Sequence, residues 1–226
     1  MQRTYRWALL FLFACTLLLV TASSLHVQAH DNDDGNKEES KIRTGFLIAP
    51  VPLNLKGKNR ELVGLGSYIV NAQGDCNGCH TQSPDTEYVF GGIPYFGQRP
   101  TIVNPATYLG GGNNFGPLVP GSADIISRNL TPDKTGRPEG GASFEDFRKI
   151  IRTGVDDDHL HPTCPTGKIN TACVPAPFDG ELLQIMPWPT YQNMTDHDLR
   201  AIYEYLSAIP CIAGPPKPDP RHHDCQ

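Results

Sequence analysis

Apolar residues recur at helical spacing in three stretches of the chain, and the first of these begins near Arg60. Positions i, i+3, i+6 and i+7 of this stretch form one apolar stripe, which predicts an amphipathic helix. The stripe consists of Leu62, Leu65, Tyr68 and Ile69. Gly64 and Gly66 lie in the same stretch, although each glycine weakens a helix by about 1 kcal/mol relative to alanine. Two such glycines indicate that another backbone approaches this helix closely.

The second and third helical stretches carry clear end signals. Ser143 and Asp146 have the spacing of a capping box, and Gly154 stands where a C-terminal cap is expected. In the last stretch Thr195 is a favourable N-cap, and Pro210 prevents the helix from continuing. The two predicted apolar faces are Phe144, Phe147, Ile150 and Ile151 in the earlier helix, and Leu199, Ile202, Tyr203 and Leu206 in the later one.

The stretches between these helices show no helical periodicity. Residues 82–142 and 155–181 are rich in glycine and proline, which number 22 and 21 in the whole chain of 226 residues. Residues 124–128 read as a short extended piece within the first of these loops. We therefore predict a mostly α fold in which a few helices are joined by long Gly/Pro-rich loops.

The N-terminal residues have the pattern of an export signal. Arg3 and Arg6 precede an apolar run over residues 7–20, and residues 27–29 offer a small-residue cleavage site. A retained membrane anchor is the alternative, but the run of about 14 residues is shorter than the ~20 that a spanning helix needs. We predict a signal peptide over residues 1–29, a periplasmic or otherwise exported bacterial protein, and no membrane span after signal removal.

Charge and cysteine content narrow the class of function. Removing residues 1–29 takes away two arginines and no acid, which changes the net charge from −5 to −7 and makes nucleic acid an unsuitable partner. Residues 30–59 begin with a charged run and are predicted to form a solvated leader or linker. Seven cysteines indicate an oxidising compartment, a bound cofactor, or both.

The motif that carries chemistry is Cys76-Asn77-Gly78-Cys79-His80. Two thiols at this spacing, followed at once by histidine, are the attachment signature of c-type haem. The thiols bind two neighbouring edges of one porphyrin, and the histidine binds its iron. A zinc site would need a second Cys/His pair at suitable spacing, and a dithiol redox site would need a βαβ setting, so both are weaker interpretations.

The residues around this motif resemble a class I cytochrome c domain. More narrowly, they resemble the cytochrome c domains in the electron-transfer subunits of bacterial membrane-bound alcohol and gluconate dehydrogenases. The blocks that carry the resemblance are residues 66–72, residues 76–81, residues 129–136, residues 144–154 and residues 186–196. The resemblance covers residues 60–211, which we take as the cytochrome c domain, and leaves residues 212–226 as a Pro-rich tail.

The resemblance implies a small helical fold around one covalent haem c, with its first and last helices crossing. The chain departs from those subunits, because it has one haem motif and no C-terminal apolar segment, and residues 137–142 are altered. In the Pro-rich tail, His222 and His223 are expected to be incidental. Arg128 is expected either to meet a haem propionate or to be solvated.

Met186 is the expected second axial ligand of the iron. It precedes the stiff segment Pro187-Trp188-Pro189, and the resemblance places the ligand there as well. Met194 lies beside a helix cap, where packing or exposure is expected. The alternatives are that Met186 fills the core and that His159, His161 or His197 binds the iron. Pro187 and Tyr191 either tune the thioether or belong to the core.

Four cysteines remain outside the haem motif, and four cysteines allow three pairings. Local pairing joins Cys164 to Cys173 and Cys211 to Cys225, and each bond would stabilise the fold by about 2–4 kcal/mol. The second bond would hold the tail against the end of the last helix. Free buried thiols are the alternative to this pairing.

These observations predict an exported monohaem cytochrome c that carries single electrons between redox protein partners, such as a periplasmic dehydrogenase or a terminal oxidase. It is expected not to be an enzyme, because a His/Met pair fills both axial positions of the iron. One alternative is a haem enzyme or small-ligand sensor with an exchangeable sixth ligand. A disulfide scaffold without haem is another.

Overall fold

The structure is a computed structural model that describes residues 35–158, 161–216, 219 and 221–226. The signal peptide expected over residues 1–29 lies outside the described residues. The chain divides into two compact units, Met1–Lys41 and Ile42–Gln226. Residues 35–41 are helical and exposed, in keeping with their charged composition. The second unit holds the motifs identified above.

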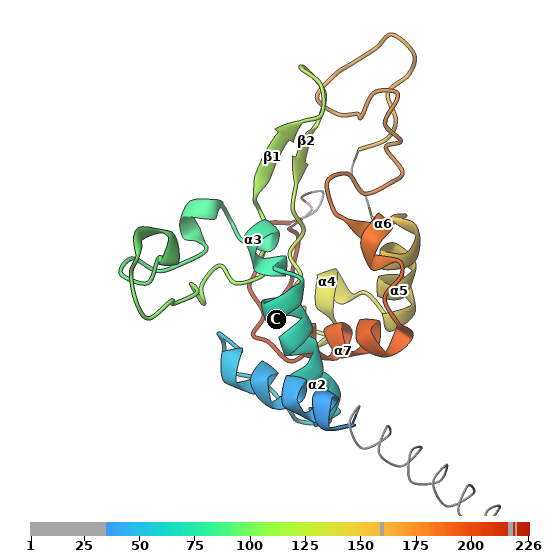
Figure 1. Cartoon of the computed structure of the whole chain (residues 1–226). Coiled ribbons are helices and arrows are strands. Elements are labelled where there is room, and N and C mark those ends of the chain that lie inside the picture. Colours follow the sequence, from blue (N-terminus) through green and yellow to red (C-terminus); the bar gives the residue numbers. More distant parts are fainter. Residues whose placement is uncertain (1–34, 159–160, 217–218, 220) are drawn as a thin grey trace, which may run out of the picture. The chain divides into compact units, whose positions relative to one another are not determined.

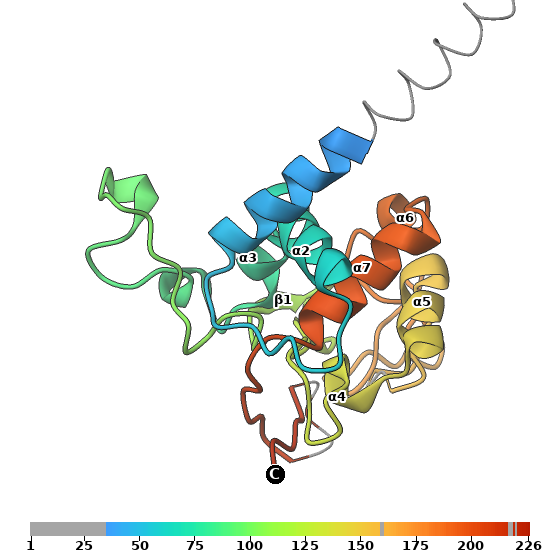
Figure 2. The ribbon, with the colours of Figure 1, turned by 90° about the horizontal axis from the view of Figure 1, so that it is seen from below.

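Two helices pack across each other at the centre of the second unit (Figures 1 and 2). Helix α2 (Arg60–Tyr68) begins at the Asn59 cap and continues into the π-helical turn η1 (Ile69–Gln73). Helix α7 (Asp196–Leu206) begins at the Thr195 cap. A Cβ atom at Gly66 would lie 1.9 Å from the Ala201 carbonyl oxygen. The close backbone approach expected from the glycines is therefore confirmed at Gly66.

The second unit begins before the boundary expected at residue 60. Residues 42–48 are helical, and a Cβ atom at Gly45 would lie 1.9 Å from the Gly64 carbonyl oxygen. The Ser67 hydroxyl donates a 2.7 Å hydrogen bond to the Gly45 carbonyl. Val51 is 7% exposed and belongs to the main core. The prediction of a solvated linker over residues 30–59 is therefore wrong for this segment, because its apolar side chains pack against the core.

Helix α5 (Phe144–Thr153) has the ends that the sequence predicted. The Ser143 and Asp146 side chains form the capping box, and Gly154 has a φ of 71° at the C-cap. The helix packs against α7 and against the short helix α6 (Trp188–Tyr191). Its apolar face therefore joins the same core as the crossed helices.

The remaining elements are short, as the glycine and proline content predicted. The helical ones are α3 (Cys76–His80), η2 (Pro84–Thr86), η3 (Pro94–Phe96) and α4 (Pro138–Gly141). Strands β1 (Asn114–Pro117) and β2 (Asp124–Ile126) form one antiparallel hairpin with an irregular register. The hairpin extends beside the loop that follows α5, and the Ala123 N–H donates a 3.1 Å hydrogen bond to the Cys173 carbonyl (Figure 1).

Two disulfides hold the loop after α5 and the C-terminal tail. Cys164 is joined to Cys173, and Cys211 to Cys225, with S–S distances of 1.98 and 1.99 Å. This is the local pairing expected from the sequence. The tail also bonds to the segment after β2, because Asn129 Nδ2 donates a 2.8 Å hydrogen bond to the Ile212 carbonyl.

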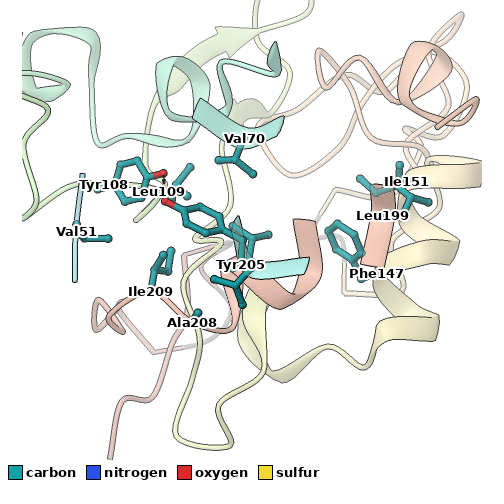
Figure 3. Packing of buried hydrophobic residues seen from close by; sticks show 12 residues of the cluster. Val51, Val70, Tyr108, Leu109, Phe147, Ile151, Leu199, Tyr205, Ala208 and Ile209 are labelled. Atoms are coloured by element: carbon teal, nitrogen blue, oxygen red, sulfur yellow. Dashed lines mark hydrogen bonds between the residues drawn. The ribbon is translucent and has the colours of Figure 1, made fainter. Parts of the chain in front are cut away.

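The main core surrounds two buried tyrosines (Figure 3). The hydroxyls of Tyr108 and Tyr205 are 2.8 Å apart, and the Asn71 side chain hydrogen-bonds to both of them. Each buried phenol therefore has polar partners, which removes the penalty for burying it. This network links η1 to α7 and to the loop before β1.

Candidate functional site

A largely apolar cavity of about 210 Å³ lies between η1, α3, α5, α7 and the long loops. Cys76, Cys79 and His80 of α3 line it, and so does Met186 from the segment before α6. The structure thus brings together the four residues that the sequence singled out for haem binding. Apolar side chains from η1, α5 and α7 complete this part of the wall, among them Ile69, Val70, Phe147, Ile151, Leu199 and Leu206.

His80 is oriented by a hydrogen bond from its own ring. Its Nδ1 atom lies 2.8 Å from the Arg128 carbonyl oxygen, so Nδ1 carries the hydrogen and donates it. Burial lowers the pKa of the His80 imidazole, which favours its neutral form. The neutral ring then keeps a lone pair on Nε2, the tautomer that an axial ligand needs.

Neither thiol of α3 is in a disulfide, and the surroundings of both favour the protonated form. Burial is the main cause that raises the pKa of Cys76 to about 12, and burial also raises that of Cys79. Helix α3 follows Asp75, whose φ of 45° turns the chain sharply into the motif. That turn positions both thiols on the wall of one cavity, where they can reach one macrocycle.

The segment that carries Met186 has a strained backbone. Ile185 has a φ of 70°, which is unusual for a β-branched residue, and the Met186 N–H donates a 2.8 Å hydrogen bond to the Gln184 carbonyl. Downstream, the Tyr191 hydroxyl donates a 3.2 Å hydrogen bond to the Gly74 carbonyl, just before the haem motif. The segment is thus tied to the start of α3.

The other candidate ligands occupy different surroundings. Met194 also lines the cavity and packs against both hydrophobic clusters of the core, whereas Met186 packs against the main one. His161, one of the alternative iron ligands, is half-buried and lines the cavity. His197 is exposed, and His159 lies outside the described residues.

Arg128 is neither solvated nor free of protein partners. Its guanidinium forms a 2.5 Å ion pair with Asp156, and the two side chains are 11% and 4% exposed. Arg128 lines the cavity together with Glu139 of α4. The pKa of Glu139 is raised to about 7, mainly by burial; the charge of Arg128 acts to lower this pKa, and the charges of Asp156 and Asp158 act to raise it. The cavity therefore has one polar corner. Sequence reasoning missed Glu139, although the altered residues 137–142 pointed to its segment.

The tail histidines are part of the fold, which corrects the expectation that they are incidental. His223 is 8% exposed, and its imidazole contacts the Thr131 carbonyl. The His222 side chain is 13% exposed, with Nε2 3.9 Å from an Asp158 carboxylate oxygen. The Cys211–Cys225 bond brings the tail back to this position, which local sequence patterns could not reveal.

The donor set of the cavity fits haem c. Two thiols, an imidazole with Nε2 available and a thioether lie on the wall of one apolar space, as a covalently bound macrocycle requires. Among the described residues, no group of three or more His, Cys, Asp or Glu side chains is arranged to hold a metal ion directly.

None of the helices that the structure describes is long and apolar enough to cross a membrane.

Three curated relatives illustrate what this chain is similar to. The gluconate 2-dehydrogenase cytochrome c subunit of Pantoea cypripedii is 32% identical over 150 residues, 66% of this chain and 23% of the relative. The fructose dehydrogenase cytochrome subunit of Gluconobacter japonicus is 26% identical over 163 residues, 72% of this chain and 24% of the relative.

The cytochrome c subunit of the quinone-dependent alcohol dehydrogenase of Gluconacetobacter polyoxogenes is 27% identical over 179 residues, 78% of this chain and 27% of the relative. The chain therefore spans about a quarter of the length of the curated relatives that it matches. No family model and no solved structure matches the chain. The gluconate and alcohol dehydrogenase subunits are of the kinds that the resemblance named, which confirms the resemblance to such cytochrome c subunits.

Proposed function

We propose that the chain is an exported, monohaem, class I cytochrome c that carries single electrons. The observation that supports this most is the largely apolar cavity lined by Cys76, Cys79, His80 and Met186. When bound there, haem c supplies an iron that cycles between its ferric and ferrous states. The relatives are cytochrome subunits of dehydrogenases, so of the two partner classes expected from the sequence, a periplasmic dehydrogenase or a terminal oxidase, we propose the dehydrogenase.

The chain's own residues have separate tasks in this proposal. Cys76 and Cys79 fix the macrocycle by thioether bonds, and His80 holds the iron through Nε2. Met186 is proposed as the second axial ligand, since its thioether is soft and neutral and follows a backbone fixed by the Gln184 turn. Filling both axial positions excludes small ligands and favours simple electron transfer.

The test compares two methionines that line the same cavity. Met186→Ala is expected to move the absorption spectrum from low spin towards high spin, to lower the midpoint potential and to admit carbon monoxide. Met194→Ala is the matched control and is expected to change none of these. An unchanged spectrum in Met186→Ala, or the full effect in Met194→Ala, would contradict the assignment of the ligand.

Covalent attachment is tested separately on the unmutated protein. Haem staining after denaturing electrophoresis should show one band, and acid acetone should leave the stain in place. Loss of the stain in acid acetone would refute attachment through Cys76 and Cys79. Rapid binding of carbon monoxide by the unmutated protein would favour the enzyme or sensor alternative over an electron carrier.

A further inference from the structure

Glu139 occupies an unusual position on the wall of the cavity. Its backbone has a φ of 54° and a ψ of 50°, a left-handed conformation that favours glycine and costs about 1–2 kcal/mol in other residues. Two glycines with positive φ, Gly140 and Gly141, follow it and could adopt this conformation without strain. A half-buried carboxyl group stands here instead and lines an otherwise largely apolar cavity.

The charged groups around Glu139 come from three other segments of the chain. Arg128 follows β2 and forms a buried ion pair with Asp156, so Asp156 offsets its positive charge. Asp158 adds negative charge from the same loop as Asp156. From the tail, His222 lies close to Gly140, and a Cβ atom there would be 3.1 Å from the imidazole Nε2.

Further titratable groups near this corner of the cavity are His161 on the cavity wall, His223 against the Gly140 N–H, Asp133 beside Gly141, and Arg137 at the start of α4. The Arg128 guanidinium lines the cavity, but its charge is neutralised by the Asp156 carboxylate. Burial then dominates, and the pKa of Glu139 is raised to about 7. A carboxyl group with such a pKa exchanges its proton readily at neutral pH.

We propose that Glu139 accepts a proton when the haem site accepts an electron, so that this protein transfers the two together. This inference rests on the proposed function, since it requires a haem in the cavity. The step balances simply: the site gains one electron from a one-electron donor, and the Glu139 carboxylate gains one proton from water. Oxidation of the site reverses both changes.

The physical reason is the loss of one positive charge inside a largely apolar cavity. In such surroundings a charge interacts with a neighbouring carboxylate far more strongly than it does in water. Reduction therefore favours the neutral, protonated form of Glu139, and by linkage protonation favours reduction. The midpoint potential of the haem site should therefore be higher at low pH than at high pH.

The experiment measures the midpoint potential of the holoprotein by spectroelectrochemical titration from about pH 5 to about pH 9. The potential of the unmutated protein should fall as pH rises through neutrality, with a slope approaching the ~59 mV that a tenfold change in proton concentration gives for one electron. Glu139→Gln should remove this slope. Glu145→Gln, which changes an exposed carboxylate of α5, is the matched control and should retain it.

Two histidine variants separate Glu139 from its titratable neighbours. His161→Asn and His222→Asn should each keep the pH dependence, and loss of the slope in either one with its retention in Glu139→Gln would overturn the proposal. A flat potential in the unmutated protein would overturn it as well. A protein without a reversible one-electron wave would instead refute the proposed function, so the two failures are distinguishable.

A measurement on the unmutated protein keeps the proposal testable should Glu139→Gln lose its haem. Infrared difference spectra of reduced minus oxidised protein should show a carboxylic acid band that shifts when glutamate is labelled with ¹³C. Unbuffered samples should take up protons from solution on reduction near neutral pH. The absence of a glutamate-dependent carboxylic acid band would rule out Glu139 as the acceptor.

Discussion

Gly66→Ala tests whether the crossing of α2 and α7 depends on a missing side chain. The added Cβ atom would lie 1.9 Å from the Ala201 carbonyl oxygen, 2.5 Å from its carbonyl carbon and 2.7 Å from Tyr205 Cβ. The first two of these atoms are backbone, so no side-chain rotation can relieve the contact. The helices must separate, and the buried residues between them lose their packing.

The expected destabilisation follows from two opposing effects. Overpacking of a core costs about 1–3 kcal/mol and occasionally more, and contact with backbone belongs at the upper end. Alanine is a better helix former than glycine by about 1 kcal/mol, which offsets part of that cost. We expect a net loss of about 2 kcal/mol, which lowers the melting temperature of a protein of this size by about 4–8 °C.

Thermal and urea unfolding followed by far-ultraviolet circular dichroism measures this loss directly. Gly35→Ala is the control, because no atom lies within 4 Å of the position that its added Cβ atom would take and its helix is exposed. Ala201→Gly should fail to rescue Gly66→Ala, since the clash is with the Ala201 backbone. Equal stability of Gly66→Ala and the unmutated protein would refute the reasoning, as would rescue by Ala201→Gly.

Three further substitutions test other parts of the fold. Gly154→Ala should destabilise by about 1–3 kcal/mol in urea unfolding, because φ is 71° and the new Cβ atom would lie 2.4 Å from the Trp188 ring; unchanged stability would contradict this. Ser143→Ala should cost about 1 kcal/mol. Because the Ser143 hydrogen bonds lower the pKa of Asp146, that pKa should rise towards its ordinary value in an NMR titration; the stability from this cap is present at neutral pH and is lost as pH falls through the folded-state pKa. Replacing Cys211 and Cys225 by serine should cost about 2–4 kcal/mol and raise the protease sensitivity of the tail, whereas an intact tail would count against its tethering role.

Local patterns predicted the elements whose determinants lie close together in the sequence. The caps of α5 and α7 and the spacing of the haem motif each depend on a few neighbouring residues. Gly66 is a partial exception. A glycine within a helix indicated that another backbone lies close to it, but the sequence could not identify that backbone as Ala201. The proposed attachment residues Cys76, Cys79 and His80 could be named from the sequence for the same reason, because they form one short and unusual motif.

The polar corner of the cavity could not be predicted in this way. Arg128, Glu139 and Asp156 come from three separate segments of the chain, and no periodicity connects them. The positions of His222 and His223 depend on a disulfide and on hydrogen bonds to residues some 80 to 90 positions earlier in the chain. Such groups become adjacent only when the chain folds, and their pKa values depend on that proximity.

Backbone strain provides an independent argument for where the function of this protein lies. The non-glycine residues with positive φ in the described part of the chain are Asp75, Leu109, Glu139 and Ile185. Three of these four line the cavity, and the fourth lies next to the haem motif, since the Leu109 N–H donates a 2.9 Å hydrogen bond to the Asn77 side chain. Strain of this kind costs about 1–3 kcal/mol at each residue and is expected to persist where surrounding contacts or a bound group enforce it. Asp75 precedes the helix that carries the two thiols, and Ile185 precedes the proposed thioether ligand. Glu139 is itself the proposed proton acceptor. The strained residues therefore converge on one cavity from separate parts of the chain, as expected if its geometry serves the cofactor rather than the stability of the fold.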